Sequence, residues 1–281
     1  MMRRLLPLVA SNVSSIIICL LACTATAQLP QRAMVDMLTI ASRPTGGGGG
    51  PTNLTRALYA WWKLDDSAGS AALDSSGSGL NGILTNSPAW VSGKVGGALE
   101  CRATGGVTGF YSYATDFWKY PTGTITWWMR QTNTWNCGLE RSFFSFWNVP
   151  GVAGLMGEIY TDNRWYLGWY GASGGTADRR WRYTSSSAMS PSNTWTHYAF
   201  VWNVAAVSAV YLNGNHILDD GDMSPVSGDA VKNAGVPFRV GSGQWGSSIP
   251  AFGGSIDDFR IYTNALSADD ISYLYHTWYG Q

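Results

Sequence analysis

Charged side chains are scarce in this sequence. Lys, Arg, Asp and Glu together make up 13% of the 281 residues, and the 18 basic residues balance the 18 acidic ones. Without a net charge, the chain gives no reason to expect nucleic acid or an anionic membrane as its partner. It contains 34 Gly, 15 Trp and 14 Tyr, a composition that disfavours an all-helical protein and favours short strands with tight turns.

Cysteine is rare as well, with four residues. Cys19 and Cys23 fall in the N-terminal segment, which leaves Cys101 and Cys137 for the rest of the chain. No zinc or redox spacing is present. In an exported domain two cysteines are candidates for a disulfide, and we expect Cys101 and Cys137 to pair.

A hydrophobic run long enough to span a membrane is missing from the N-terminus. The short apolar run Ile16–Ala22 follows two arginines and precedes the cleavage signal Ala25-Thr26-Ala27, which predicts a signal peptide over residues 1–27. The alternative is a bacterial lipobox, which Leu20–Cys23 resembles, with a lipid anchor at Cys23. Both alternatives predict export, to a secreted, extracellular protein or to a cell-surface lipoprotein.

Residues 28–56 lack the composition of a packed segment. Pro44 and the five consecutive glycines Gly46–Gly50 predict a flexible tether. A phosphate-binding loop would need Gly-Lys-Ser/Thr after a strand, and Pro51 follows the glycines instead. No second linker or repeat interrupts residues 57–281, so we expect a single domain there.

Short candidate strands recur between turn signals throughout this domain. Asn-Gly and Asp-Gly pairs at Asn81, Asn213 and Asp220 indicate tight turns. Regular short strands with Gly-rich turns predict an all-β, antiparallel two-sheet sandwich. The expected strands are Leu58–Lys63, Ala98–Cys101, Ile125–Arg130, Ser142–Trp147, Trp165–Trp169, Thr196–Trp202, Ala209–Leu212 and Phe238–Val240.

The stretch Gly253–Tyr275 predicts a last strand and a short C-terminal helix. Alternation along the strand puts Asp257 on the same face as Phe259 and Ile261, toward the core, and Asp258 on the surface. A buried carboxylate must be charge-paired, hydrogen-bonded or metal-bound.

The helix has its own start signals. Ser267 and Asp270 have the spacing of an N-terminal cap, and Leu266 and Ile271 can form a hydrophobic staple.

An ordered set of motifs covers the domain. It resembles the laminin-G-like, concanavalin A-like lectin/glucanase jelly rolls that are common in secreted bacterial proteins. The resemblance implies a jelly-roll sandwich, a role in adhesion or carbohydrate binding, and in many members calcium. The motifs are Ala60–Asp66 (AWWKLDD), Ala72–Gly77 (ALDSSG), Trp90–Leu99 (WVSGKVGGAL), Thr124–Trp128 (TITWW), Trp195–Phe200 (WTHYAF), Tyr211–Gly214 (YLNG) and the closing strand.

Asp74, Asn81 and Asp257 are the candidate calcium ligands. The resemblance suggests that the loop Asp74–Asn81 lies close to the last strand, and calcium prefers carboxylate, amide and carbonyl oxygens. Such an ion would join the two ends of the domain. The alternative is that Asp74 is a turn residue and that Asp257 accepts backbone N–H bonds.

Catalysis has little support. Glucanases of this fold carry alternating acids of the type E-x-D-x-x-E on one strand, and most glycoside hydrolases need two carboxylates about 5–10 Å apart. Glu158 with Asp162 is the nearest approach, and it lacks the third acid. Asp257 and Asp258 are expected on opposite faces of a strand, where they cannot act as a pair.

Exposed aromatic rings are the stronger functional indication. Sugar-binding surfaces stack Trp and Tyr faces on pyranose rings, and several tryptophans lie in or beside Gly- and Asn-rich stretches. The alternative is that most of them fill the core, as aromatic side chains usually do. The candidate ligand-binding residues are Trp135, Trp165, Trp169, Trp181, Arg182 and Trp245.

The sequence therefore predicts a non-catalytic extracellular module for carbohydrate binding or adhesion. A glycan or an extracellular protein is its expected partner, and calcium is its expected cofactor. The alternative is a structural cell-surface protein that mediates protein–protein contacts, and a glycoside hydrolase is less favoured than either.

Overall fold

A computed structural model describes much of the unit formed by residues 47–281. The expected signal peptide, residues 1–27, lies outside the described residues, as do residues 28–51 of the expected tether, so both stay predictions. The described residues are 52–102, 108–114, 117, 120–132, 141–146, 154–159, 164–170, 179–183, 193–203, 208–217, 237–243 and 252–277.

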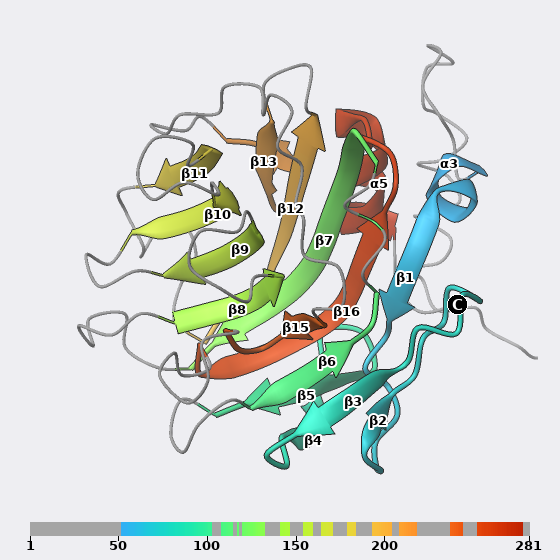
Figure 1. The fold of residues 1–281 in the computed structure, drawn as a ribbon, viewed down its shortest axis with the longest axis vertical. Coiled ribbons are helices and arrows are strands. Elements are labelled where there is room, and N and C mark those ends of the chain that lie inside the picture. Colours follow the sequence, from blue (N-terminus) through green and yellow to red (C-terminus); the bar gives the residue numbers. More distant parts are fainter. Residues whose placement is uncertain are drawn as a thin grey trace, which may run out of the picture. The chain divides into compact units, whose positions relative to one another are not determined.

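The described strands form two antiparallel sheets of eight strands each (Figure 1). The strands of sheet A are β1 (Leu58–Trp62), β4 (Ala89–Ser92), β5 (Gly97–Cys101), β7 (Thr122–Gln131), β12 (Thr196–Asn203), β13 (Ala209–Leu212), β14 (Asn215–His216) and β16 (Gly254–Tyr262). Those of sheet B are β2 (Ala71–Ala72), β3 (Gly82–Thr85), β6 (Gly109–Ser112), β8 (Arg141–Phe146), β9 (Gly154–Ile159), β10 (Trp165–Tyr170), β11 (Arg179–Tyr183) and β15 (Phe238–Val240).

The strand order brings distant parts of the chain together. Sheet A runs β14-β13-β12-β7-β16-β5-β4, with β1 paired to β16, and sheet B runs β11-β10-β9-β8-β15-β6-β3-β2. The last strand, β16, therefore pairs with three strands from the first half of the domain. The predicted all-β, two-sheet antiparallel jelly roll is confirmed.

Each expected strand overlaps an observed one. The β13–β14 hairpin turns at Asn213 and Gly214, whose φ values of +49° and +79° suit the expected two-residue turn. The predicted last strand is β16, and the strands that the sequence did not indicate have two to six residues. A segment that short shows too few alternations to be recognised.

Aromatic rings dominate the core between the two sheets. The ring of Trp127 lies 5.2 Å from that of Tyr198 and 5.6 Å from that of Phe143. Trp165 stacks on Tyr198 at 5.0 Å from the other side of the sandwich. The alternative in which tryptophans fill the core thus applies to several of them. The largest fully buried side chains are Trp62, Trp127, Trp165, Trp202, Tyr198, Tyr262, Phe110, Phe117, Phe143, Phe144 and Phe146.

Helix α5 (Ala268–Thr277) covers part of the outer face of sheet A (Figure 1). Its predicted cap is confirmed, because Ser267 Oγ accepts the N–H of Asp270 and the Asp270 carboxylate accepts the N–H of Ser267, each at 3.1 Å. Leu266 and Ile271 are buried in the same cluster, as the staple predicts. Packing within this cluster holds the helix against the sheet.

The described part of the chain has one further helix, α3 (Thr52–Arg56). Its Leu54 is buried in the cluster under α5, so packing begins before Ala57, inside the range expected as tether. Neither described helix combines the length and the apolar character needed to cross a membrane.

Candidate functional site

The closing strand β16 contains a bulge at its two aspartates. Asp258 has a φ of +50°, and the register with β7 shifts between Asp257 and Arg260. Because a bulge adds one residue to a strand, Ile256 stays in the core while Asp257 lies on the outer face, paired with Trp128. The prediction that Asp257 faces the core is therefore wrong, since strict alternation fails at this point.

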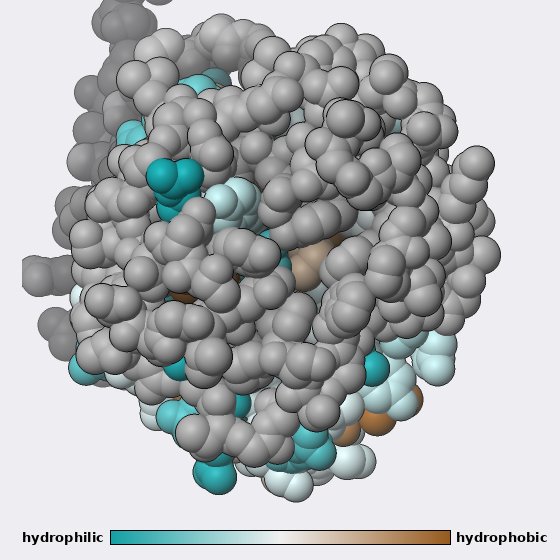
Figure 2. Space-filling model, turned by 60° about the vertical axis from the view of Figure 1, so that its left-hand side comes forward, coloured by the Kyte–Doolittle hydropathy of each residue, from teal (hydrophilic) through white to brown (hydrophobic). Residues whose placement is uncertain are grey.

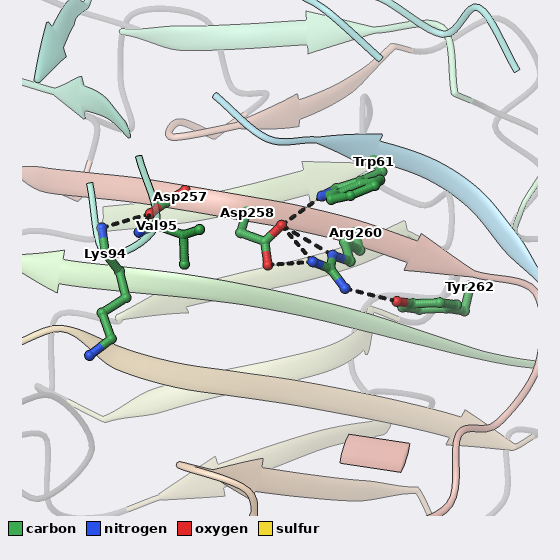
Figure 3. Close-up of polar contacts among 7 residues, drawn as sticks. All are labelled: Trp61, Lys94, Val95, Asp257, Asp258, Arg260 and Tyr262. Atoms are coloured by element: carbon green, nitrogen blue, oxygen red, sulfur yellow. Dashed lines mark hydrogen bonds and ion pairs between the residues drawn. The ribbon is translucent and has the colours of Figure 1, made fainter. Parts of the chain in front are cut away.

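Asp257 holds the turn between β4 and β5. One of its oxygens, Oδ2, accepts the backbone N–H groups of Lys94 (2.7 Å) and Val95 (2.9 Å) (Figure 3). Gly93 has to be small, because a Cβ there would collide with the carbonyl of Gly97 and lie 2.6 Å from Asp257 Oδ2. The backbone of this turn is thus held by direct contact with a carboxylate.

The second oxygen of Asp257, Oδ1, is buried and has no hydrogen-bond partner among the described residues. Burial raises the pKa of Asp257 to about 8, and the negative charges of Asp258 and Asp65 add to the effect. The two backbone N–H groups only partly offset it. Asp257 is therefore a buried acid that titrates near neutral pH.

Asp258 and Arg260 form a buried ion pair beside this turn (Figure 3). Arg260 Nη2 lies 2.8 Å from both carboxylate oxygens of Asp258, and the indole of Trp61 donates to Asp258 Oδ1 at 2.6 Å. The Arg260 guanidinium also stacks on Trp61 and donates to the hydroxyl of Tyr262. Asp258 is only 7% exposed, so its expected surface position is wrong as well.

Asp74 organises the loop after β2. Its carboxylate accepts the backbone N–H groups of Trp61, Ser76 and Leu80 at 2.9–3.0 Å and the hydroxyl of Ser76 at 2.9 Å. Asn81 Oδ1 accepts the N–H of Asp74 at 2.9 Å. Burial alone would raise the pKa of Asp74, but these hydrogen bonds outweigh it and hold the pKa below its ordinary value.

These contacts do not fit a calcium site made by Asp74, Asn81 and Asp257. Calcium takes roughly six to eight oxygen ligands, and of these side-chain oxygens Asp257 Oδ1 is the one without a donor among the described residues. Within the described ranges, no group of three or more His, Cys, Asp or Glu side chains is placed to hold a metal. The hydrogen bonds match the alternative left open by the sequence, and calcium itself stays a prediction.

The predicted ligand-binding aromatics do not form one described surface. Trp165 is fully buried in the core, so its prediction as a stacking residue is wrong. Trp135 and Trp245 lie outside the described residues. Trp169 lies in β10, and Trp181 and Arg182 lie in β11, with side chains outside the described set, so all three stay predictions.

Cys101 lies on β5, its thiol is fully buried, and it forms no disulfide with another described residue. Burial raises its pKa far above the ordinary value. Cys137 lies outside the described residues, so the predicted disulfide stays a prediction.

The outer face of sheet B carries a line of residues in register across seven strands. On most of these strands the chain neighbours of the line lie in the core, for example Phe110 beside Tyr111 and Phe238 beside Arg239, so the line itself faces outward. We call it the outer row; it consists of Ala71, Ile83, Tyr111, Arg239, Ser145, Met156 and Gly168.

The outer row is accessible at its β3–β6–β15 end. Ile83 is 46% exposed, and Tyr113, directly after the end of β6, is 61% exposed. The rings of Tyr111 and Tyr113 meet edge to face at 6.0 Å, and the Arg239 guanidinium lies over Tyr111 at 5.4 Å. Figure 2 shows hydrophobic and hydrophilic described residues side by side at the lower end of the molecule, where Figure 1 places β2, β3 and β4.

No sequence motif indicates this surface. Tyr111, Tyr113 and Arg239 are far apart in the chain and belong to no motif, so only the pairing of β6 with β15 brings them together. The available signal was the alternation of Phe110 with Tyr111 and of Phe238 with Arg239, which marks outward positions.

The acids that came nearest to a glycosidase pattern in the sequence are buried or engaged elsewhere where the structure describes them. Glu158 is fully buried in β9, and Asp162 lies outside the described residues. Asp258 is committed to Arg260, and Asp257 to the β4–β5 turn. His197 is buried in β12, where burial, with a smaller contribution from the charge of Arg260, lowers its pKa to about 3.

The fold and these surfaces define a β-sandwich domain of the lectin type. The family described as the concanavalin A-like lectin/glucanases superfamily matches residues 104–272, which is more than half of the chain. This chain belongs to that superfamily. No curated protein matches it.

Solved structures share the fold at low sequence identity. The receptor-binding domain of the botulinum neurotoxin C/D mosaic serotype is 14% identical, with a TM-score of 0.57 over 79% of this chain and 51% of the toxin domain. The binding domain of Paraclostridial Mosquitocidal Protein 1 is 17% identical, with a TM-score of 0.53 over 79% and 52%. This chain thus spans about half the length of those toxin domains.

A carbohydrate-active enzyme provides a third match. Domain 4 of AbnA, a GH43 extracellular arabinanase from Geobacillus stearothermophilus, was solved in complex with arabinotriose. It is 21% identical, with a TM-score of 0.50 over 77% of this chain and 97% of that domain.

Proposed function

We propose that this domain is a non-catalytic extracellular module that binds glycans on the outer face of sheet B. The observation that carries the proposal is the accessible part of the outer row, where Arg239 lies over Tyr111 and the exposed ring of Tyr113 lies beside Tyr111. The opposite outer face, on sheet A, is covered by α5 and the β4–β5 turn.

The side chains of this surface suit sugars. A tyrosine ring offers an apolar face to the C–H groups of a pyranose and a hydroxyl to its oxygens. A guanidinium offers several donors in a fixed plane. The row crosses the strands, so a linear oligosaccharide lying along it would meet Ile83, Tyr111 and Arg239 in succession.

Similar folds agree with a binding role. The arabinanase domain was solved with a bound trisaccharide, and the toxin domains are receptor-binding domains. For the present chain these likenesses concern the fold, and the proposal itself rests on its own tyrosines and arginine.

The absence of a catalytic role is part of the proposal. A glycosidase needs an acid and a second carboxylate on either side of the bond. The buried Glu158 and the ion-paired Asp258 are both unavailable for that arrangement among the described acids.

Affinity electrophoresis in gels that contain single polysaccharides tests the proposal. We expect retardation by at least one neutral or acidic polysaccharide and its loss in the Tyr111→Ala/Tyr113→Ala double variant. Tyr120→Ala is the matched control, because Tyr120 is 45% exposed and lies outside the outer row. Retardation that survives the double variant, or that never occurs, would contradict binding at this face.

The same gels run with calcium and with EDTA test the predicted cofactor. Loss of retardation or a lower melting temperature in EDTA would support calcium, and no change would support the hydrogen-bonded alternative seen at Asp74. If no polysaccharide retards the protein, the protein-contact alternative gains support, and pull-down with cell-surface fractions examines it.

A further inference from the structure

Arg239 occupies the middle of the outer row. Its strand, β15, lies between β6 and β8, so its neighbours across the sheet are Tyr111 on one side and Ser145 on the other. The guanidinium rests over the Tyr111 ring. Arg239 is half-buried, and because its neighbours Phe238 and Val240 lie in the core, Arg239 is on the outward face of the strand.

No carboxylate of the described residues pairs with Arg239. The groups that favour its charge are the phenols of Tyr111 and Tyr113, while burial lowers its pKa below the ordinary value for arginine. Arg260 provides the contrast, because there the buried guanidinium is met by both oxygens of Asp258. A half-buried cation without a neighbouring acid is unfavourable, because burial removes part of its hydration and no opposite charge replaces it.

One nitrogen of this cation and one neighbouring hydroxyl have no hydrogen-bond partner. Arg239 Nε and Ser145 Oγ are both buried atoms without a hydrogen-bond partner, and their residues are direct neighbours across the β15–β8 pair. Ser145 is itself fully buried. Buried polar atoms are nearly always satisfied in folded proteins, so two adjacent exceptions beside an unpaired cation indicate a place for a ligand acceptor.

We infer that Arg239 and Ser145 form an anion subsite, and that the glycan bound on the outer row is an acidic one. Its carboxylate or sulfate group would accept hydrogen bonds from Arg239, while Tyr111 and Tyr113 contact the ring of the same or the adjacent sugar. A guanidinium is well suited to such anions, because it can donate two parallel charged hydrogen bonds to a pair of oxygens. This inference rests on the proposed glycan-binding function and narrows it to one class of sugar.

Three probes that share a sugar backbone type separate the outcomes. We would titrate the full chain with polygalacturonate, with a sulfated galactan and with a neutral galactan, by calorimetry at two salt concentrations. We expect one of the two acidic polymers to bind at least about tenfold more tightly than the neutral one, and its affinity to fall with salt.

Variants assign the effect to the subsite. Arg239→Met keeps the apolar stem over Tyr111 and removes the charge, and it is expected to reduce acidic binding roughly tenfold or more. Arg56→Met removes an equal charge from an exposed arginine of α3 and is expected to change affinity less than about twofold. Ser145→Ala is expected to produce a smaller loss than Arg239→Met.

Each remaining outcome supports or overturns the anion subsite, and one of them also overturns glycan binding. Equal binding of acidic and neutral galactans, or acidic binding unaffected by Arg239→Met, overturns the anion subsite and leaves glycan binding intact. No binding to any polymer, here and in the wider gel panel, overturns both proposals. If Arg239→Met does not fold, Arg239→Lys replaces it: a severalfold loss supports the subsite, and unchanged affinity overturns it.

Discussion

Two arginines on opposite outer faces of this sandwich have opposite surroundings. On sheet A, Asp258 and Arg260 neutralise each other, and Trp61 and Tyr262 complete their hydrogen bonds. On sheet B, Arg239 has tyrosines for neighbours instead of an acid.

The difference distinguishes polar groups that stabilise the fold from polar groups that we propose to bind a ligand. Buried charge that is fully paired fixes a geometry and has little left to offer a ligand. Sheet A needs this because its last strand joins three other strands, a turn and a helix. On the outer row of sheet B, Arg239 has no acid beside it among the described residues, and the proposed anion subsite would supply an acceptor for its buried Nε.

The largest test of this comparison is to break the ion pair on sheet A. Asp258→Ala leaves Arg260 buried without a partner and deprives the Trp61 indole of its acceptor. We expect the free energy of unfolding to fall by about 3–5 kcal/mol, measured by urea denaturation.

Two variants control for other causes. Asp258→Asn keeps a side chain that tolerates the positive φ and removes the charge, so it separates pairing from backbone strain. Asp269→Asn removes an exposed acid of α5 and should cost less than about 1 kcal/mol. A loss below about 1 kcal/mol in Asp258→Ala would mean that sheet A is not held by this pair.

The second test uses pH. Sheet A also holds two titratable groups whose protonation changes the stability of the fold in opposite directions as pH rises. Asp257 has a raised pKa of about 8 when folded, so the folded state binds the extra proton between about pH 4 and 8 and stability falls as pH rises through that window. His197 has a lowered pKa of about 3, so the unfolded state binds the extra proton below about pH 6.5 and stability rises up to that point.

The two effects on stability cancel between about pH 4 and 6.5, and above that range Asp257 alone makes stability depend on pH. We expect the wild type to lose up to about 2 kcal/mol between pH 6.5 and 8. Asp257→Asn keeps an acceptor for Lys94 and Val95 and should abolish the loss. Urea denaturation at pH 5, 6.5 and 8 measures both, and a parallel decline in the variant would remove Asp257 as the cause.

The sequence predicted the fold well because its signals are local. The capping box at Ser267, the turn at Asn213 and the strand alternations each depend on neighbouring residues. Alternation failed at Asp257 because a bulge is set by pairing with β7, which no local pattern records.

The site was harder for the same reason. For Asp74 the sequence left two alternatives open, a calcium ligand or a turn residue, and only the positions of its donors favour the turn residue. Trp165 looked like a stacking residue because its strand alternates, but alternation does not say which face is buried. Tyr111 and Arg239 meet through long-range pairing, which one sequence cannot reveal.

The smallest expected effect on stability is the sharpest test of the comparison. Tyr113 and Tyr262 are the same residue type on opposite outer faces, one 61% exposed and the other fully buried under α5. We expect Tyr262→Ala to cost about 3–5 kcal/mol of unfolding free energy and Tyr113→Ala less than about 0.5 kcal/mol. In the polysaccharide gels the order should reverse, with Tyr113→Ala weakening retardation severalfold. A Tyr113→Ala variant that is strongly destabilised would show that its ring supports the fold, and the distinction between the two faces would fail.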